Sequence, residues 1–500
     1  MSDKIYDLAV IGAGPGGYHS AIRAAQFGAN VALIEKENLG GTCLNWGCIP
    51  TKALYASSAL IQKIREHGED FGLKCSLDLD FAKAVERKNQ VVKELVDGIK
   101  ALEKGWKNDV YMGHGKIIGG DKDKGFDIEI KGEDNTTIKA KRIIIATGSS
   151  PALIPAFNID HERILTSDDI LHPDFKKVPE RLLIIGAGVI GCEFGNIFST
   201  FGSKVTMLEY LPSPIATEER MVIRELQKKF DELNIEIHVS QNVLSVENTG
   251  NGVKATTCSA DVPRDQVDSA EKSFFEADIC LVSIGRAKES SNLGLEEMGI
   301  ATERGAIKAN KDTLETDCEG IYAIGDVTGG VMLAHVASYE GDIAVNNALT
   351  SIGGFPTHQE TTDYSVVPAT IFTNPNIGSV GMRRQEAKDK GMDVAMGRFP
   401  FQSLGKALCM GEDEGFIMIL ADKEDGKIVG ASCIGAEAPE LISEIALAMK
   451  HGLNVQDISE VIHSHPTISE MVLEGAEDVF GMSIHRKGRP DLDFHKRVKK

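Results

Sequence analysis

Residues 5–17 read I-Y-D-L-A-V-I-G-A-G-P-G-G, an apolar run that passes directly into a glycine-rich turn. This pattern predicts a buried parallel strand and the start of a helix that continues to about Phe27. A second strand is predicted at Val31–Ile34, and it is followed by Glu35, 18 residues after the last glycine of the turn. Strand, turn, helix, strand and acid in this order predict a dinucleotide-binding unit, because glycines let the backbone approach a pyrophosphate and the acid can hold ribose hydroxyls. The predicted contacts are Gly12, Gly14, Gly17 and Glu35.

The same pattern occurs a second time. Arg181–Ile185 is predicted as a strand, residues 186–191 read G-A-G-V-I-G, and the next strand, Val205–Leu208, is followed by Glu209. A carboxylate there accepts both hydroxyls of an NAD ribose and repels the 2′-phosphate of NADP. Because no arginine follows until Arg220, the sequence predicts NAD at this unit. The predicted contacts are Gly186, Gly188, Gly191 and Glu209.

Residues 40–52, which follow the first unit, read G-G-T-C-L-N-W-G-C-I-P-T-K and carry Cys43 and Cys48. Along a regular helix this spacing is a rise of about 7.5 Å, beyond the separation that a disulfide tolerates. The pair can therefore close only where the backbone is irregular, and Asn45 and Gly47 supply that freedom. A close, strained pair at a helix start favours a redox-active disulfide. A structural disulfide and half of a zinc site remain alternatives, although the other seven cysteines are scattered singly.

Two dinucleotide units with a cysteine pair directly after the first describe an electron relay. Its parts are a nicotinamide dinucleotide, another dinucleotide and a disulfide. This other dinucleotide is expected to be FAD, because a flavin can exchange a hydride on one face and pass two electrons to a disulfide on the other. The predicted cofactors are thus FAD and NAD, and no metal is expected.

With these motifs the chain resembles the flavoprotein disulfide reductases that have two dinucleotide sites, and among them it is most similar to the dihydrolipoamide dehydrogenases. The resemblance covers nearly the whole chain and also rests on A-T-G at 146–148, I-G-R at 284–286, G-D at 325–326 and H-P-T-I-S-E at 465–470. It implies an α/β fold with two Rossmann-like dinucleotide-binding domains and a C-terminal α+β dimerisation domain. Trp46 and a polar stretch near 258–273 depart from the family pattern.

The resemblance also implies where the domains begin and end. An FAD-binding domain that includes the redox disulfide is expected at 1–150, and an NAD-binding domain at 151–280. The chain should return to the FAD-binding domain at 281–352 and finish with the dimerisation domain at 353–500.

Catalytic roles follow from the resemblance as well. Dihydrolipoamide is expected to attack Cys43, the outer thiol, while His465 removes its proton and Glu470 holds the imidazole. A lone His–Glu pair is more often a surface ion pair, but the disulfide reductase motifs favour the catalytic interpretation. Cys48 is expected to face the flavin, and Lys52 to stabilise the negative charge there. The remaining cofactor contacts that the resemblance implies are Gly41, Thr42, Gly115, Thr147, Gly148, Glu193, Gly285, Arg286, Asp326 and Ala334.

Composition agrees with this assignment and excludes other classes. The chain has 54 basic and 74 acidic residues, and a net charge of −20 disfavours nucleic acid or an anionic membrane as a partner. No apolar run is long enough to span a membrane, and Met1–Lys4 leads straight into the first strand without a leader sequence. The compartment expected from these features is the cytoplasm, and the resemblance implies a homodimer that acts on dihydrolipoamide carried by lipoyl domains of 2-oxo acid dehydrogenase or glycine cleavage proteins.

Three alternatives remain at this stage. Glutathione or trypanothione reductases use NADPH, which the acid at Glu209 disfavours. Mercuric reductases and large thioredoxin reductases carry another thiol pair near the C-terminus, whereas the last cysteine here is Cys433. A catalytically silent scaffold subunit is expected to lose one of the catalytic residues, and all four of the central ones are present: Cys43, Cys48, His465 and Glu470.

Several elements between the motifs can be predicted too. Phe81–Lys104 is expected to be a surface helix covering the first sheet, and residues 248–273 an exposed hairpin or loop insertion. In the last domain we predict strands at 369–372, 377–382, 415–421 and 428–434, and helices at 439–451 and 467–480.

Overall fold

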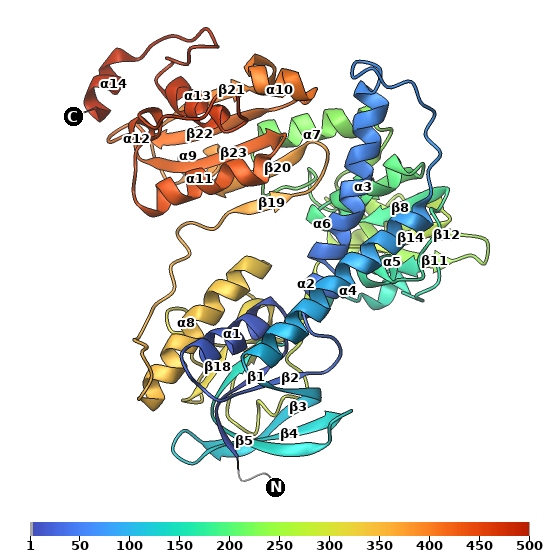
Figure 1. Cartoon of the computed structure of the whole chain (residues 1–500). Helices are drawn as coiled ribbons and strands as arrows, with labels where there is room; N and C mark the ends of the chain where they lie inside the picture. Colours follow the sequence, from blue (N-terminus) through green and yellow to red (C-terminus); the bar gives the residue numbers. More distant parts are fainter. Residues whose placement is uncertain (1–3, 500) are drawn as a thin grey trace.

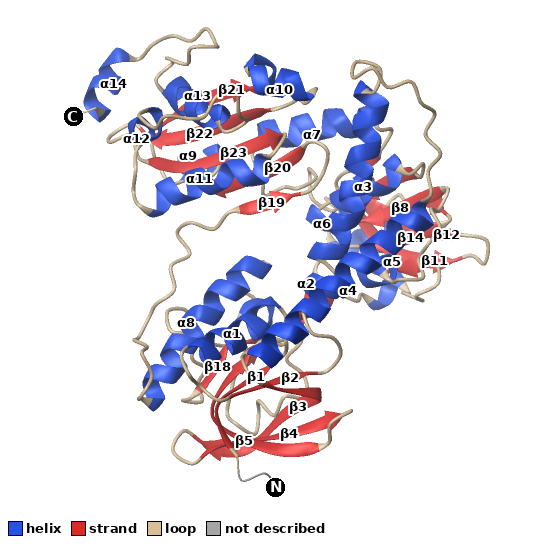
Figure 2. Ribbon diagram, viewed as in Figure 1, coloured by secondary structure: helices blue, strands red, loops and turns tan. Residues whose placement is uncertain are grey.

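The computed structural model describes residues 4–499 and has three bodies, each built on its own sheet (Figure 1). Figure 2 shows helices packed against each sheet and an extended segment that leads from the first body to the third. No helix among the described residues is long and apolar enough to cross a membrane.

The N-terminal body contains a six-stranded sheet. The chain leaves this sheet after β5 and returns to it at β18. Strand β1 pairs in parallel with β2 on one side and β5 on the other, and β18 joins β5 after the chain has passed through the second body. Helices α1 and α8 pack on each other beside this sheet. The elements are β1 (Ile5–Ile11), α1 (Pro15–Gln26), β2 (Val31–Glu35), β3 (Asp109–Asp121), β4 (Gly125–Gly132), β5 (Thr136–Ile145), β18 (Ile321–Ala323) and α8 (Ala334–Ile352).

The second body contains a five-stranded parallel sheet of order β10-β9-β8-β14-β7. Its strands are apolar along most of their length because the sheet is buried on both faces. The elements are β7 (Ile164–Leu165), α5 (Ser167–Leu171), β8 (Arg181–Ile185), α6 (Val189–Thr200), β9 (Lys204–Leu208), α7 (Arg220–Glu232), β10 (Glu236–His238) and β14 (Ile279–Val282).

The segment 248–273, predicted as an exposed hairpin or loop insertion, does form hairpins, but they belong to a second, antiparallel sheet that is partly buried. Strand β12 (Val253–Ser259) lies between β11 (Gln241–Asn248) and β13 (Ser273–Ala277). Val253 and Ala255 are buried in a core shared with β8. The prediction was wrong for β12 because the polar composition of the region hides an alternation of buried and half-buried side chains. Within this segment, residues 249–252 and 260–272 are the connections between strands.

The third body is an antiparallel sheet of order β19-β20-β23-β22-β21, with α11 packed on β20 and β23 and α13 packed on β21 and β22. The four predicted strands are found within two residues of their predicted limits, and β21 was not predicted. The elements are β19 (Ala369–Ile371), β20 (Asn376–Gly381), α9 (Arg384–Asp389), β21 (Val394–Pro400), α10 (Gly405–Met410), β22 (Phe416–Asp422), β23 (Ile428–Gly435), α11 (Ala438–Lys450), α12 (Val455–Ser459), α13 (Glu470–Val479) and α14 (Leu492–Val498).

Two long helices, α3 (Cys48–His67) and α4 (Phe81–Gly105), pack on each other and connect the bodies. We predicted that α4 covers the first sheet. This is true only of its C-terminal half. Val96 and Ile99 belong to the core of the first body, whereas Phe81 and Val85 lie in a core with side chains of the second. One helix thus contributes to two cores.

Candidate active site

A cavity of about 1380 Å³ lies where the first and second bodies meet, and β19 of the third body contributes to its wall. Both predicted glycine turns and both predicted acids line it, as do the two cysteines. The predicted residues on its surface are Gly12, Gly14, Glu35, Gly41, Thr42, Cys43, Cys48, Lys52, Thr147, Gly148, Gly186, Gly188, Glu193, Glu209, Gly285, Arg286, Asp326 and Ala334.

The first glycine turn is tightly closed. Gly12 has φ +98°, a conformation that favours glycine, and a Cβ on Gly17 would lie 1.8 Å from the carbonyl oxygen of Gly12. Glu35 at the end of β2 accepts hydrogen bonds from the backbone N–H of Ala13 (2.7 Å) and Glu37 (2.9 Å). Burial raises the pKa of Glu35, and these hydrogen bonds oppose the rise. The acid therefore fixes the turn as well as facing the cavity.

The second turn repeats this construction. Gly186 has φ +97°, and a Cβ on Gly191 would lie 2.0 Å from the carbonyl oxygen of Gly186. Glu209 accepts the backbone N–H of Ala187 at 2.6 Å and of Leu211 at 2.8 Å. The two predicted units are therefore alike in detail.

Both turns lead into helices whose N-termini have no side-chain cap. Helix α1 follows Gly14 and α6 follows Gly188, and neither preceding residue offers a side chain to the first N–H groups. Uncapped N–H groups and the helix dipole suit a phosphate. Since both N-terminal turns line the cavity, its residues fit two dinucleotides.

The cysteine pair sits at a break between two helices. Helix α2 (Gly41–Asn45) ends before Trp46, and α3 begins at Cys48, so the backbone is irregular between the cysteines, as predicted. The pair is in the dithiol form, and the two thiols share a hydrogen bond. That bond and the charge of Lys52 hold the pKa of Cys48 below its usual value, although burial opposes them. The bond and burial raise the pKa of Cys43. These pKa directions favour Cys48 over Cys43 as the thiolate of the pair.

Lys52 is held by one carboxylate that also contacts the third body. Its Nζ lies 2.8 Å from both oxygens of the buried Glu193 on α6. Glu193 accepts the backbone N–H of Phe372 at 3.0 Å, and Lys52 Nζ lies 4.7 Å from the centre of the Phe372 ring. Since these residues come from all three bodies, the charge beside Cys48 depends on how the bodies are assembled.

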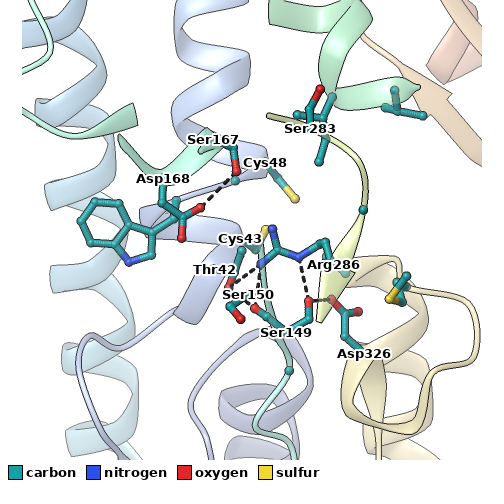
Figure 3. A pocket seen from close by; sticks show the side chains of 18 of the residues that line it. Thr42, Cys43, Cys48, Ser149, Ser150, Ser167, Asp168, Ser283, Arg286 and Asp326 are labelled. Atoms are coloured by element: carbon teal, nitrogen blue, oxygen red, sulfur yellow. Dashed lines mark hydrogen bonds between the residues drawn. The ribbon is translucent and has the colours of Figure 1, made fainter. Parts of the chain in front are cut away.

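A polar cluster connects the end of β5 with the return of the chain to the first sheet (Figure 3). Strand β6 (Ser149–Pro151) pairs with β15 (Arg286–Lys288). Arg286 donates to the hydroxyl and the carbonyl oxygen of Ser149, both at 2.7 Å, and to Thr42 at 3.5 Å. Ser149 in turn donates to Asp326 at 2.5 Å. Sequence reasoning missed Ser149, although it directly follows the A-T-G motif.

The structure places five of the predicted residues away from the cavity surface. Gly17 and Gly191 lie behind the turns, where their lack of a side chain permits closure. Gly115 lies on β3, where a Cβ would be 3.1 Å from Ile34. His465 and Glu470 belong to the third body and do not line the cavity.

His465 and Glu470 nevertheless form the predicted pair. His465 Nδ1 lies 2.9 Å from Glu470, which also accepts the backbone N–H of Thr467 at 2.9 Å. The imidazole is 79% exposed. Ile462 and Ile484, in the same body, are 97% and 77% exposed. An exposed acid–base pair in a domain with large exposed apolar side chains suits an interface between subunits.

Trp46, the residue between the cysteines that departs from the family pattern, also faces the second body. Its ring is stacked on that of His172, with centroids 6.5 Å apart and planes 6° from parallel. Both residues line the cavity. No local sequence signal marks His172, which lies 126 residues further along the chain.

These features define a disulfide oxidoreductase with two dinucleotide sites. Residues 6–341 match the family model of pyridine nucleotide-disulphide oxidoreductases, and residues 367–476 match the dimerisation domain of the same group. The chain belongs to the pyridine nucleotide-disulphide oxidoreductase family.

Relatives within this family are similar along nearly their whole length. Dihydrolipoyl dehydrogenase of Chlamydia muridarum (strain MoPn / Nigg) is 40% identical over 478 residues, covering 95% of this chain and 97% of the relative. A dihydrolipoyl dehydrogenase of Bacillus subtilis (strain 168) is 38% identical, covering 96% and 99%. Among solved structures, LpdA from Mycobacterium tuberculosis superposes with a TM-score of 0.84 at 26% identity, covering 94% of this chain and 99% of that one. The HOCl-induced flavoprotein disulfide reductase RclA from Escherichia coli reaches 0.81 at 28% identity, with coverage of 94% and 99%.

Proposed function

We propose that this protein is an NAD-dependent dihydrolipoyl dehydrogenase, which oxidises dihydrolipoamide to lipoamide and reduces NAD⁺ to NADH. The observation that carries the proposal is the Cys43–Cys48 pair on the wall of a cavity that holds two dinucleotide turns. Identity of 38–40% to dihydrolipoyl dehydrogenases along almost the whole chain supports this substrate.

FAD fits the first turn and NAD the second. The first turn adjoins the segment that carries the cysteines, and the second ends in Glu209, which is followed by Tyr210, Leu211 and Pro212 rather than by an arginine. FAD supplies the link between a two-electron thiol couple and the nicotinamide. The acid at Glu209 argues against the NADPH-dependent glutathione and trypanothione reductases.

The cysteines exchange electrons with the substrate by thiol–disulfide exchange. One substrate thiol loses its proton to His465 and attacks Cys43 in the oxidised pair, which breaks the S–S bond and releases Cys48 as a thiolate. His465 passes this proton to solvent and takes the proton of the second substrate thiol, which attacks the substrate sulfur of the mixed disulfide and breaks its bond to Cys43; Cys43 leaves and recovers the second proton from His465. The charge of Lys52, which lowers the pKa of Cys48, also stabilises Cys48 as the leaving thiolate.

His465 reaches a cysteine pair only if it belongs to the other subunit of a two-fold dimer. This part of the proposal is supported by the position of the His465–Glu470 pair outside the cavity and by the match of residues 367–476 to a dimerisation domain. Each active site would then combine Cys43 and Cys48 of one subunit with His465 and Glu470 of its partner.

The proposal extends to domain limits, partners and compartment. The proposed FAD-binding domain comprises 1–150 and 281–352, the NAD-binding domain 151–280 and the dimerisation domain 353–500; the three largest sheets support this division, except that β14 of the second body extends to Val282. The natural partners are lipoyl domains of 2-oxo acid dehydrogenase or glycine cleavage proteins, and the compartment is the cytoplasm.

Steady-state rates test the proposed substrate and the proposed nucleotide. Steady-state rates should favour dihydrolipoamide with NAD⁺ over NADP⁺, and over glutathione disulfide or Hg²⁺ with NADPH, by at least about 100-fold in kcat/KM. Equal or greater rates with glutathione disulfide would assign the chain to another reductase.

The shared site is tested with hybrid dimers. C43S and H465A subunits are each inactive, but a mixed dimer contains one complete site, so random reassembly should restore roughly a quarter of the sites. Mixed dimers that are confirmed by mass and remain inactive would show that the base does not come from the partner.

A further inference from the structure

Helix α13, which begins with Glu470, carries three carboxylates on one face at intervals of four residues: Glu470, Glu474 and Asp478. Residues with this spacing are neighbours on a helix, and like charges placed so destabilise it. Glu474 and Asp478 are buried, and Glu470 is 19% exposed. A row of acids in such a position requires partners.

Each acid has a basic partner, and two of the partners come from the C-terminal segment. Glu470 binds His465. Asp478 pairs with Arg486 and accepts the backbone N–H of Arg398 at 2.7 Å. Glu474 accepts His485 Nδ1 at 2.5 Å and the hydroxyl of Ser483. The His485–Glu474 pair therefore repeats the His465–Glu470 pair one helical turn further along α13.

The two pairs have the same construction. In both, a largely buried carboxylate binds Nδ1 of an exposed imidazole; the His485 ring is 67% exposed and the His465 ring 79%. Both carboxylates also accept a backbone N–H, from Thr467 in one pair and from His485 itself in the other. In each pair the hydrogen bond to the carboxylate uses Nδ1 and leaves Nε2 available for another partner.

His485 acts electrostatically on Glu470 as well as on Glu474. The hydrogen bond to Glu474 and the charges of Glu474, Glu470 and Glu477 raise the pKa of His485. Burial raises the pKa of Glu470, but hydrogen bonds from Thr467 and His465 and the charges of the two histidines hold it below its usual value. Three acids of α13 thus face His485, which favours its charged form.

We propose that His485 is a positioning residue for the reaction: its imidazolium cancels the charge of Glu474, so that the base His465 is acted on by the carboxylate of Glu470 and not by two carboxylates. The proposal rests on the proposed function, in which His465 takes the proton of the substrate thiol. His485 itself lies beyond residue 476, where the match to the dimerisation domain ends.

Loss of the positive charge on His485 is expected to move the pH profile in one direction. In H485N the negative charge of Glu474, one helical turn from Glu470, is no longer cancelled, and the added negative potential favours a positive charge on a neighbouring imidazole. A base must be unprotonated to act, so the acidic limb of the pH profile is expected to move to higher pH. One uncompensated charge on the next helical turn near a protein surface shifts a titration by about 0.5 unit.

The first experiment compares pH profiles of kcat/KM for dihydrolipoamide in the intact dimer. H485N keeps an amide N–H at the position of Nδ1 and removes the charge. Its acidic limb should lie about 0.5 unit above that of the wild type, with about a threefold loss of kcat/KM below the limb and none on the alkaline plateau. H358N is the matched control, because His358 pairs with Glu360 at 3.2 Å in an exposed segment of the chain, and its profile should not move.

A second substitution separates charge from structure. E474Q/H485N removes both members of the pair, which leaves the local charge as in the wild type, and its acidic limb should return to the wild-type position. If His485 only anchors the C-terminal segment, H485N and the double variant lower the rate equally at every pH and leave the limb in place. That result would overturn the proposal, as would an equal shift in both variants.

A measurement without substrate tests the role of His485 separately from the proposed function. In the reduced dimer, the pH dependence of Cys43 alkylation by iodoacetamide reports on the neighbouring imidazole, and H485N should shift it in the same direction. A wild type inactive on dihydrolipoamide would refute the proposed function, whereas an active wild type with no shift in either profile of H485N would refute the role of His485. Should H485N not form a dimer, H485Q takes its place in the same comparison.

Discussion

The two glycine turns of this chain have nearly the same backbone conformation and the same lack of room for a side chain, but their surroundings differ. The first glycine of each has almost the same φ, +98° and +97°, and a Cβ on the last glycine would meet a carbonyl oxygen at 1.8 Å in one turn and 2.0 Å in the other. Over the first turn lies the cysteine-bearing segment, and a Cβ on Gly41 would be 2.6 Å from Gly14. A Cβ on Gly14 itself would lie 4.0 Å from the Cα of Gly41, whereas a Cβ on Gly188, the matching residue of the second turn, would meet nothing within 4 Å.

This difference explains how one motif serves two purposes. The first turn is closed over by the segment that carries the cysteines, and its helix α1 packs on α8, where a Cβ on Gly16 would be 3.0 Å from Ala337. A dinucleotide held there can be released only if packed chain moves. The second turn is open on its cavity side, as a site for an exchanging substrate must be.

The largest expected effect comes from the last glycine of each turn. Gly17→Ala places a methyl group against the Gly12 carbonyl, which should cost about 3 kcal/mol or more and yield protein without bound flavin. Gly191→Ala makes the same clash in the second turn and should abolish turnover with NADH while the flavin is retained. Flavin absorbance per subunit and NADH oxidation rates separate the two outcomes. Full flavin content in G17A would contradict the comparison.

A smaller effect is expected where the turns differ. Gly41 has φ +54° and lies against Gly14, so Gly41→Ala should speed flavin release roughly tenfold. Gly188→Ala meets open space and should leave flavin release and the melting temperature unchanged, while the KM for NADH rises by about tenfold because the methyl group enters the nucleotide site. Flavin fluorescence on release measures the first quantity. Equal flavin loss in both variants would show that the cover over the first turn has no role.

The smallest effect concerns pH and the first body alone. Glu103 near the C-terminal end of α4 is buried, and burial raises its pKa to about 7, against which a hydrogen bond from Asn108 acts. Because the pKa is higher in the folded state, its contribution to stability is present at acidic pH and is lost as pH rises toward and through 7. Glu103→Gln should therefore gain about 2 kcal/mol over the wild type between pH 5 and pH 8. Urea unfolding monitored by flavin release at the two pH values tests this, with NADH affinity as the control. A constant difference would mean that Glu103 does not titrate in this range.

The local units could be predicted from the sequence, since their signals lie within a few residues. Strand β1 was predicted at Ile5–Ile11 and β8 at Arg181–Ile185, where both are found. Apolar runs bounded by glycine turns define both ends of such strands. Most predicted contacts also reach one cavity, because parallel strands of both units end beside it.

What could not be predicted depends on chain segments that meet only after folding. His485 has no motif around it, and its position against α13 results from the return of the chain after Gly481, which has φ +69°. Ser149 and Asp326 are 177 residues apart and meet because β5 and β18, which precede them, are parallel neighbours. The N-terminal end of helix 467–480 was predicted three residues early, because Thr467 and Ser469 hydrogen-bond to each other ahead of the helix rather than joining it.

The shared helix α4 has a mechanical consequence. At about 37 Å it is a rod, and its two ends are fixed in the cores of different bodies. A hinge between these bodies would have to pull Phe81 and Val85, or Val96 and Ile99, into water, at about 1.5 kcal/mol or more for each side chain. The shared helix therefore opposes hinge motion between the two bodies that form the cavity.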